Sequence, residues 1–420
     1  MGIERPVLGG PVTELPDEPN DVVQAILVPE TRGELYPLYH RLRALAPVFP
    51  TDVRGLPPGA WALSSFAAVD RVARSSAAVN DPRTARVFDH DGRAGAFFRM
   101  MADSMLFVDK TAHDRIRRLV FRAFTPRAVA ALEGLTAKVA NELLDLVVDD
   151  GEMDLVQAYS YPLPIRAICK LLGIPSDLQP EIERWAWDFA RAGDPMSSTP
   201  EIGARGDAAA EGFRALFEQL LSERRQHPRD DVMSLLVQAE EDGETLSLDE
   251  AISTCVLLLQ AGHETTADLL GNALIGLFRH PDQLAWLCGH PEMTRQAVEE
   301  LLRYDCSVQM SMRLLTSDVE VGGCVIPEGS LAALMYGAAN RDPARFEEAD
   351  QLDLRRAPQH LAFSAGAYHC LGNALARLEL KAGISVLLDR LPNIEPATSS
   401  FIQRRTMRLR GPQQLRVRWG

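Results

Sequence analysis

The sequence predicts a mainly helical protein with small β-sheets. Apolar residues recur at intervals of three and four in segments 35–49, 128–148 and 209–226, which is the spacing of one face of an α-helix. Strand-like runs are short, and they lie near Trp61, around Val321 and in the C-terminal QQLRVRW. Helical periodicity over most of the chain, with only brief strands between, is typical of an α-rich fold that carries small sheets.

The chain is predicted to form one domain. A length of 420 residues allows either two average domains or one large one. The Pro/Gly-rich stretches RGLPPGA and RAGDPMSSTP are too short for interdomain linkers, and the sequence has no internal repeat or low-complexity tract. We therefore expect an N-terminal tail over residues 1–20 and a single domain over residues 21–420.

Composition argues against nucleic acid and membranes as partners. The chain has 58 acidic and 44 basic residues, whereas binding to a phosphate backbone needs clustered positive charge. Its six cysteines have no framework spacing and no CxxC pair, which suits a reducing cytosol. The N-terminus has neither the apolar run of a signal peptide nor the length of a membrane anchor. We expect a cytoplasmic monomer.

Segment 251–278 is predicted to be a long helix through the core, because it is apolar on nearly every face and would measure about 40 Å. A membrane span is the alternative, but His263, Glu264 and Asp268 would be costly in lipid. Gly262 is unfavourable in mid-helix by roughly 1 kcal/mol relative to alanine, and a buried glutamate is rare without a partner or a task. These polar residues are either an exposed patch or a functional site, and their apolar flanks favour the second interpretation.

The stretch FSAGAYHCLG, residues 363–372, places Cys370 in a glycine-rich turn before a predicted helix. Gly366 and Gly372 permit close backbone approaches, and the positive end of the helix stabilises a thiolate. A lone cysteine is most often a small buried hydrophobe. Zinc would need further ligands at short spacing, and a nucleophile would need a histidine base placed by the fold. One thiolate suffices as the axial ligand of haem iron.

Cationic partners for two haem propionates can be found elsewhere in the chain. In HDRIRRLVFRAF, His113 and Arg117 are four residues apart and share one helical face. Arg313 precedes a strand and is a third candidate. A solvated amphipathic helix is the other interpretation of the first segment. The basic residues on its roughly opposite face are Arg115, Arg118 and Arg122.

The chain resembles the soluble bacterial cytochrome P-450s, which are haem-thiolate monooxygenases, from its first helix to its C-terminus. The resemblance rests on motifs in the same order: HDRIRR, AGHETT, EELLR, AANRDPARF, and FSAGAYHCLG followed by LARLE. It implies the cytochrome P-450 fold, with haem b between the long central helix and the cysteine loop and helix. It implies that Cys370 binds the iron and that haem is contacted by His113, Arg117, Ala261, Gly262, Thr265, Arg313, Phe363, Gly366, Tyr368 and Gly372.

The resemblance also implies roles for two polar pairs. Glu264 and Thr265 match the family's acid and alcohol: Thr265 would hydrogen-bond dioxygen, and Glu264 would gate protons from solvent. Gly262 would lie where the helix widens locally for dioxygen. Glu300 and Arg303 match a structural ion pair beneath the haem.

Three positions depart from the family pattern. Ser364 replaces a glycine of the cysteine loop, and Tyr368 replaces a basic residue that contacts a propionate. Because a tyrosine hydroxyl can donate one hydrogen bond, we expect Tyr368 to keep this contact, with His369 as the alternative. Gln351 lies near the position where many relatives have an arginine that joins the structural ion pair, so the sequence leaves that third member unassigned.

The resemblance implies hydroxylation or epoxidation of a medium-to-large apolar small molecule, with dioxygen as co-substrate. Because the chain has no flavin or iron–sulfur segment, electrons would come from NAD(P)H through a ferredoxin reductase and a ferredoxin. The arginine face at 115, 118 and 122 is either the ferredoxin docking surface or solubilising charge. Secondary-metabolite tailoring of a polyketide or terpenoid is the expected role, and a fatty acid, steroid or xenobiotic is the alternative substrate. A non-catalytic haem sensor or recruitment module, or direct use of peroxide, would not need the acid and alcohol.

By resemblance, the substrate pocket is walled by residues 86–106, 185–199, 260–261, 307–310 and 399–403. Aromatic and methionine side chains in these segments favour an apolar substrate, although any core contains the same types. Gln260 is polar where an aliphatic residue would be unremarkable, and we expect it to hydrogen-bond a substrate oxygen. The predicted pocket residues are Phe97, Phe98, Gln260, Val308, Gln309, Met310 and Phe401.

Overall fold

Helices make up most of the computed structural model, which describes residues 15–28, 35–80, 95–121, 126–194, 199–241, 243–398, 401–404, 406 and 408–420. The helices are α1 (Pro19–Leu27), α2 (Leu35–Leu45), α3 (Phe66–Ala73), α4 (Ala96–Ala102), α5 (Lys110–Phe121), α6 (Pro126–Leu144), α7 (Pro162–Leu172), α8 (Gln179–Ala192), α9 (Pro200–Gln226), α10 (Val232–Gln238), α11 (Leu248–Arg279), α12 (Pro281–Gly289), α13 (Thr294–Tyr304), α14 (Tyr336–Ala339) and α15 (Asn373–Arg390). The predicted mainly helical class is confirmed. Of the predicted tail, residues 1–14 lie outside the described ranges, and α1 already begins at Pro19.

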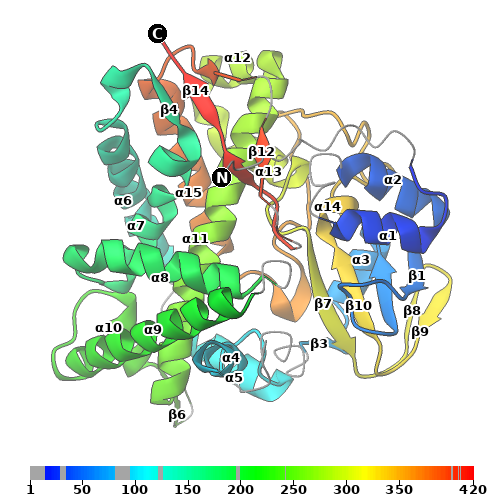
Figure 1. Ribbon diagram of the computed structural model, residues 1–420, viewed down its shortest axis with the longest axis horizontal. Coiled ribbons are helices and arrows are strands. Elements are labelled where there is room, and N and C mark those ends of the chain that lie inside the picture. The colour runs from blue at the N-terminus through cyan, green and yellow to red at the C-terminus, as the bar shows by residue number, and fades with distance from the viewer. Residues whose placement is uncertain are drawn as a thin grey trace.

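The larger sheet has the strand order β1-β2-β10-β7-β3, in which β2 and β10 are parallel and the other pairs antiparallel. Figure 1 shows this sheet beside α1, α2 and α3 on one side of the molecule and most helices on the other. A second sheet, β11-β14-β4, ties the C-terminus to the segment before α7. The strands are β1 (Val48–Thr51), β2 (Ala60–Leu63), β3 (Ala78–Val79), β4 (Glu152–Asp154), β5 (Glu240–Glu241), β6 (Glu244–Thr245), β7 (Met310–Leu315), β8 (Val319–Val321), β9 (Cys324–Ile326), β10 (Leu331–Met335), β11 (Glu395–Pro396), β12 (Ile402–Gln403), β13 (Pro412–Gln414) and β14 (Arg416–Arg418).

Helix α11 is the predicted long helix, and Figure 1 shows it running through the helical side of the molecule. It starts at a capping box: the Glu250 amide donates to Ser247 Oγ at 3.1 Å, and the Ser247 amide donates to the Glu250 carboxylate at 2.9 Å. Its 32 residues span roughly 48 Å. Residues 251–256 and 266–277 are buried, whereas the middle of the helix carries several partly exposed positions. That interruption marks the part of the helix that the protein does not fully cover.

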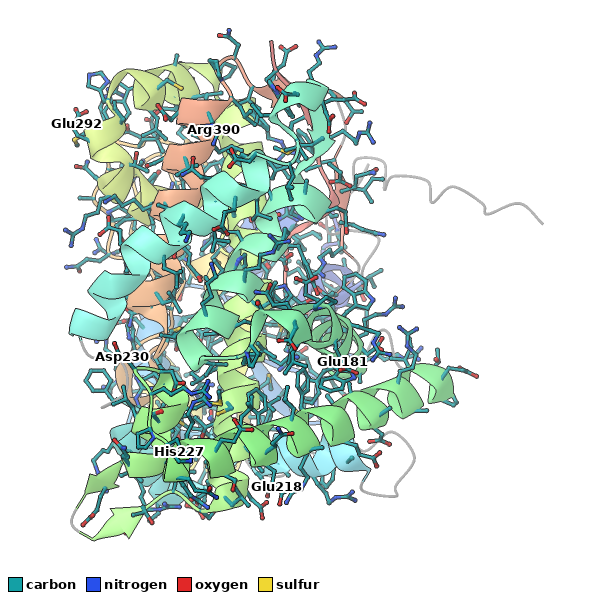
Figure 2. All side chains as sticks on the ribbon, turned by 90° about the vertical axis from the view of Figure 1, so that its left-hand side faces the viewer. Glu181, Glu218, His227, Asp230, Glu292 and Arg390 are labelled. Carbon is teal, nitrogen blue, oxygen red and sulfur yellow. The ribbon has the colours of Figure 1, made fainter. Side chains whose placement is uncertain are left out.

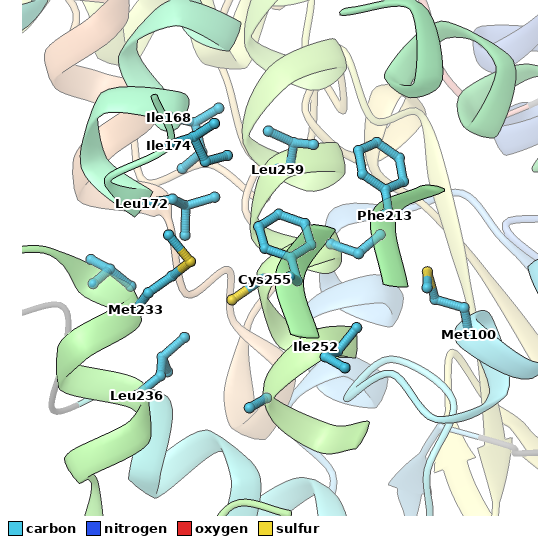
Figure 3. Close-up of a cluster of buried hydrophobic side chains, with 14 of the residues drawn as sticks. Met100, Ile168, Leu172, Ile174, Phe213, Met233, Leu236, Ile252, Cys255 and Leu259 are labelled. Carbon is cyan, nitrogen blue, oxygen red and sulfur yellow. The ribbon is translucent and has the colours of Figure 1, made fainter. Parts of the chain in front are cut away.

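Two apolar cores pack around α11. The first joins its N-terminal half to α4, α7, α9 and α10, and Figure 3 shows Ile168, Phe213, Met233 and Cys255 converging there. The second joins its C-terminal half to α6, α13 and α15. Two further cores cover the opposite faces of the larger sheet, one with α3 and one with α1 and α2. Packing therefore holds both halves of the helix, and the middle of the helix is less completely covered.

Charged side chains cover the outside of the helical side. Figure 2 shows Glu218 and His227 on α9 and just beyond its end, and both are exposed. Within the described residues, no helix has both the length and the apolarity that crossing a membrane requires.

Candidate active site

The cysteine turn is shaped by close packing against α3. Gly366 has φ +68°, and a Cβ there would lie 2.4 Å from the carbonyl oxygen of Ala73, so only glycine fits. The Cys370 amide donates to the Phe363 carbonyl at 2.9 Å, and Asn373 Nδ2 donates to the Cys370 carbonyl at 2.8 Å. These bonds fix Cys370 just before the N-terminus of α15.

Ser364, which replaces a family glycine, adopts φ +60°. This left-handed conformation costs a non-glycine residue about 1–2 kcal/mol. Its hydroxyl accepts a hydrogen bond from Tyr336 Oη at 2.8 Å, and Tyr336 Oη lies 2.6 Å from Ser311 Oγ. The serine thus keeps the glycine-like backbone and gains a polar tie to β7 and α14.

Opposing effects act on the Cys370 thiol. Burial raises its pKa, while the Gly372 amide and the charges of Arg117 and Arg377 act in the other direction. Arg117 Nη2 also donates to the His369 carbonyl at 2.6 Å. The cationic side chains are therefore placed to favour a thiolate, although the net direction for the isolated protein is toward the thiol.

His113, Tyr368 and Arg313 form one cluster beside this turn. The rings of His113 and Tyr368 have centroids 4.4 Å apart, and Arg313 Cζ lies 4.7 Å from the Tyr368 ring centroid. His113 and Arg313 are buried. Arg313 Nε and Tyr368 Oη are buried without a hydrogen-bond partner among the described residues. Unpaired buried donors are costly, so this cluster fits an anionic group such as the propionates of haem b.

The ring of His369 lies elsewhere, 6.5 Å from the ring of Phe363. Of the two candidates for the propionate contact, Tyr368 is therefore the one that shares a cluster with His113 and Arg313.

Ala261 is exposed and Gly262 and Thr265 are half-buried in the middle of α11. Thr265 Oγ1 donates to the Ala261 carbonyl at 2.7 Å, within one turn of the helix. Gly262 lies within the continuous helix α11, and a Cβ there would lie 3.6 Å from Ile168 Cδ1. This stretch of α11 keeps a hydroxyl beside an uncovered helical face.

Glu264 forms an ion pair with Arg404, which lies in the C-terminal hairpin of β12 and β13. Arg404 Nη1 lies 2.6 Å from Glu264 Oε1 and 3.2 Å from Asp268 Oδ1. Its guanidinium carbon is 5.7 Å from the Trp187 ring centroid. Glu264 therefore has an ionic partner, and its side chain is 17% exposed.

Glu300 and Arg303 form a fully buried bidentate ion pair, with bonds of 2.7 and 2.8 Å. Arg303 also donates to the carbonyls of Asn340, Ala349 and Gln351. The third member that the sequence left unassigned is Arg356, whose Nε lies 3.3 Å from Glu300 Oε1. Gln351 contributes only its backbone.

Comparisons with known proteins point to one family. A family profile for Cytochrome P450 matches residues 201–287 and 289–400. Cytochrome P450 CYP107DY1 of Priestia megaterium is 39% identical, over 74% of this chain and 76% of its own. The 6-deoxyerythronolide B hydroxylase of Saccharopolyspora erythraea is 34% identical, over 91% of this chain and 95% of its own. The solved structure of P450BioI in complex with hexadec-9Z-enoic acid ligated acyl carrier protein superimposes with a TM-score of 0.86 and 30% identity, over 93% of this chain and 99% of that one.

The chain belongs to the cytochrome P450 family. It is a cytochrome P450 monooxygenase, and the family's haem-thiolate chemistry matches a turn that presents one half-buried cysteine beside unpaired donors.

The predicted pocket residues of this P450 differ in how far they are buried. Phe97 is buried edge-on against Phe189, with ring centroids 4.5 Å apart. Phe98 and Val308 are half-buried. Gln260 has a buried Nε2 without a hydrogen-bond partner among the described residues. The wall segments 86–94, 195–198 and 399–400 lie outside the described residues.

Two predicted pocket residues belong to a core of this P450 instead. Gln309 is buried, accepts a hydrogen bond from Tyr39 Oη at 2.7 Å, and donates from Nε2 to the Cys306 carbonyl at 2.5 Å. Met310 packs in the core between the larger sheet and α1 and α2. We withdraw both from the pocket, because their side chains are used inside the protein.

Phe401 lies near the C-terminal end of α11, with its ring centroid 5.7 Å from Arg279 Cζ. Arg404, three residues further along the chain, reaches Glu264. The place of Phe401 in the pocket wall stays a prediction.

Of the three arginines expected to form a basic face on α5, one is engaged within the P450, one is exposed and one lies outside the described residues. Arg115 forms an ion pair with Glu250 at the start of α11. Arg118 is exposed and lies 3.8 Å from Glu244, and Arg122 lies outside the described residues. Arg115 thus ties α5 to α11 and is not a free docking charge.

Sequence reasoning did not identify two residues that the P450 fold brings to these clusters, Arg356 and Arg404, and it named Asp268 only as one polar residue of the long helix. Asp268 lies four residues after Glu264, so helical spacing alone could have placed both on one face. Arg356 and Arg404 carry no such signal, since their partners are 56 and 140 residues away in the chain.

Proposed function

We propose that this P450 hydroxylates or epoxidises a medium-to-large apolar small molecule in the tailoring of a polyketide or terpenoid secondary metabolite. The observation that carries the proposal is an incompletely covered stretch of α11 that bears Thr265 and directly follows residues of the same apolar core as α4. Phe97, Phe98 and the half-buried Leu257 and Leu258 belong to or pack against the same apolar core. Apolar walls with a few polar groups are typical of small-molecule sites.

The residues of this chain would hold haem b in a defined way. Cys370 would ligate the iron, and Arg313 Nε, Tyr368 Oη and His113 would bind the propionates. Arg117 would keep the loop in place through the His369 carbonyl. When bound, the haem-thiolate supplies the activation of dioxygen and the transfer of one oxygen atom to substrate.

The other residues manage protons and substrate position. Thr265 Oγ1 can release its bond to the Ala261 carbonyl and donate into the site instead. Glu264 holds or passes a proton at its carboxylate, one residue away on the helix. Gln260 Nε2, which has no partner among the described residues, would donate to an oxygen of the substrate. The apolar side chains exclude water from the reacting carbon.

The proposed substrate class rests on similarity to known P450s as well as on the apolar residues expected around the substrate. A relative covering 91% of the chain is the 6-deoxyerythronolide B hydroxylase. A second candidate is an acyl chain delivered on a carrier protein, because the similar P450BioI structure holds a fatty acid ligated to acyl carrier protein. Spin-state titration with free macrolactones, terpenoids, steroids and fatty acids, and with a carrier-linked acyl chain, separates these classes.

Electron supply is also part of the proposal. NAD(P)H would feed a ferredoxin reductase and a ferredoxin, which would dock near the cysteine turn. Turnover with a surrogate ferredoxin system, compared with turnover by peroxide, tests this route. Product formation only with the electron-transfer proteins supports it, whereas equal or faster turnover with peroxide contradicts it. Haem binding without any turnover would point to a sensor.

The first experiment is a carbon monoxide difference spectrum of the reduced, haem-loaded protein. We expect the absorption of a thiolate-ligated haem, its loss in Cys370→Ser, and its retention in Cys288→Ser, which changes an exposed cysteine. A thiolate spectrum in Cys370→Ser would contradict the assignment of the ligand.

Gln260→Leu tests the polar contact to substrate. We expect weaker substrate binding by roughly tenfold, the cost of leaving one hydrogen-bonding group of the ligand unpaired, and altered regiochemistry. Unchanged affinity and product pattern would remove Gln260 from the site.

A further inference from the structure

Arg408 of the C-terminal hairpin lies between two segments that are expected to wall the substrate pocket. Its backbone carbonyl accepts a hydrogen bond from the Gln309 amide at 2.9 Å, which joins it to segment 307–310. Its side-chain Nη2 donates to the Gly193 carbonyl at 3.5 Å, at the C-terminal end of α8. The arginine therefore reaches from one expected wall of the pocket to another.

The same hairpin also meets α11 next to the proposed active site. Arg404, four residues before Arg408 in the chain, has its Nη1 2.6 Å from Glu264 Oε1, and Thr265 is the next residue of α11. The charge of Glu264 also acts on the guanidinium of Arg408. Arg408 is therefore within electrostatic range of the incompletely covered stretch of α11.

Arg408 is accessible to solvent and yet desolvated. The residue is exposed, whereas burial is the first cause that lowers the pKa of its guanidinium. A charged group that water can touch but bulk solvent cannot surround lies in a recess of the protein. Because the same side chain contacts the end of α8 and lies within range of Glu264, we assign this recess to the expected substrate pocket.

The protein stabilises the charge of Arg408 less completely than that of two other arginines in this segment. A carboxylate oxygen lies 2.6 Å from Arg404 Nη1, and another lies 2.9 Å from Arg410 Nε. Although burial opposes it, these carboxylates hold the pKa of both arginines above the usual value. At Arg408 burial outweighs the charges of Asp194 and Glu264, and the pKa is lowered. A further anion beside Arg408 would therefore be favourable.

The contact between Arg408 and Gly193 leaves the guanidinium able to turn toward a ligand. A distance of 3.5 Å is at the long limit for a hydrogen bond, and the acceptor is a neutral backbone carbonyl. A guanidinium binds a carboxylate through two parallel charge-assisted hydrogen bonds, each about twice as strong as a neutral one. A carboxylate on a ligand would therefore compete well with the carbonyl for this side chain.

Other residues expected around the substrate fit the apolar part of such a ligand. Phe98, Leu257 and Leu258 are half-buried and pack against one apolar core. Gln260 lies one turn before Glu264 on the same face of α11, and its Nε2 is a buried donor without a hydrogen-bond partner among the described residues. An apolar body with one acidic end matches this set of groups.

We propose that Arg408 binds a carboxylate of the substrate, so that the substrate of this P450 is an amphiphilic acid with an apolar body and one ionised carboxyl group. The inference rests on the proposed function and narrows its substrate class to polyketides or terpenoids that bear a free acid. Arg408 selects and orients the substrate and takes no part in the oxygen transfer. Neutral macrolactones and carrier-linked thioesters have no such carboxylate and are expected to bind more weakly.

Matched pairs of an acid and its methyl ester test the charge preference without a mutation. The probes are hexadec-9Z-enoic acid, the diterpenoid abietic acid and the steroid deoxycholic acid, each with its methyl ester. Each is titrated into the haem-loaded protein at about pH 8, where a free carboxyl group is ionised, and binding is followed by haem spin state and by calorimetry. We expect at least one acid to bind about tenfold or more tightly than its ester. If no acid binds more tightly than its ester, the proposal is overturned.

Arg408→Gln removes the charge and keeps a polar side chain. For the acid that wild type prefers, we expect binding to weaken by about tenfold or more, with the affinity for its methyl ester unchanged. Arg408→Lys keeps the charge without the planar guanidinium and should retain part of the preference. Arg416→Gln, which changes an exposed arginine of β14, is the control and should bind acid and ester as wild type does. Equal losses for acid and ester in Arg408→Gln would show that Arg408 only shapes the pocket, and would overturn the proposal.

The proposed function and the role of Arg408 fail in different ways. A wild type that gives no thiolate-ligated haem spectrum contradicts the proposed function itself. A wild type that oxidises neutral compounds but binds no acid better than its ester overturns the role of Arg408 alone. An acyl chain on a carrier protein that binds more tightly than the corresponding free acid overturns it as well. If Arg408→Gln does not fold, the comparison of acid and ester in wild type decides by itself.

Discussion

Single side chains in the cysteine turn and near it keep an unfavourable conformation or a partly buried charge because specific neighbours stabilise them. Ser364 occupies a left-handed conformation where the family has glycine, and the Tyr336 hydroxyl bonds to it. Glu299 is a second case, since Arg377 and His360 both bind its carboxylate. In each, one residue departs from its usual preference because a specific partner offsets the cost.

Ser364→Gly and Ser364→Ala should separate backbone strain from the hydrogen bond. Both variants lose the bond from Tyr336, but only alanine keeps the Cβ that disfavours φ +60°. We expect Ser364→Ala to be less stable than Ser364→Gly by about 1 kcal/mol in chemical unfolding. Equal stabilities would show that the backbone relaxes when the serine is removed.

Glu299→Gln should destabilise the protein in a pH-dependent way. Although burial opposes ionisation, hydrogen bonds from His360 and Arg377 lower the pKa of Glu299 to about 2. A depressed carboxyl pKa contributes stability above its unfolded value, and this contribution is lost as pH falls toward 2. We expect a loss of about 2 kcal/mol at pH 7 that shrinks below pH 4, measured by unfolding at several pH values. The exposed Glu292→Gln serves as control and should show no such dependence.

At the scale of elements, the short helix α4 depends on the longer helix α9 for a hydrogen bond at its N-terminus. Helix α4 has no side-chain cap of its own; the carboxylate of Asp207 on α9 accepts a hydrogen bond from the Phe97 amide at 2.8 Å. Gly95, the residue before α4, has no Cβ because one would lie 2.4 Å from Asp207 Oδ1. A distant helix thus caps the element that carries Phe97 and Phe98.

Asp207→Ala should loosen α4 in particular. Loss of an N-cap costs about 1 kcal/mol, and here the cost falls on one seven-residue helix. We expect faster amide hydrogen exchange within residues 96–102 and unchanged exchange in the C-terminal half of α11. Asp207→Asn keeps an acceptor oxygen and should behave as wild type. Uniform protection in the alanine variant would show that packing alone holds α4.

Across the whole molecule, Arg303 joins elements that are far apart in the chain. It pairs with Glu300 on its own helix and donates to carbonyls at positions 340, 349 and 351, while Arg356 completes the cluster. Both side chains of the pair are 0% exposed. The helical side and the segment after α14 are therefore connected through one fully desolvated charge network.

Arg303→Met should lower the free energy of unfolding by about 3–5 kcal/mol, because it leaves Glu300 buried without its main partner. Arg355→Met, which removes an exposed arginine 3.7 Å from Asp353, should change it by less than about 1 kcal/mol. Denaturant unfolding of both variants checks the contrast. Similar losses in the two would mean that the buried network contributes no more than a surface pair.

The sequence by itself determined the helical class, the long central helix and the cysteine turn. These follow from local patterns: a long segment that is apolar on nearly every face indicated α11, and the FSAGAYHCLG motif identified the turn that carries Cys370. Helical spacing grouped His113 with Arg117, and motif order supplied Arg313 and the Glu300–Arg303 pair. Nearby residues in the chain constrain one another directly, which is why such patterns can be interpreted without coordinates.

Only the tertiary structure decided which distant residues meet. It joined Arg404 to Glu264 and Asp268, and Arg356 to Glu300, because long-range packing brings together segments whose spacing carries no signal. It also placed the side chains of Gln309 and Met310 inside the protein and that of Phe401 beside the C-terminal end of α11. Whether an apolar or amide side chain faces a pocket or a core depends on the direction set by the folded backbone, and composition is the same in both cases.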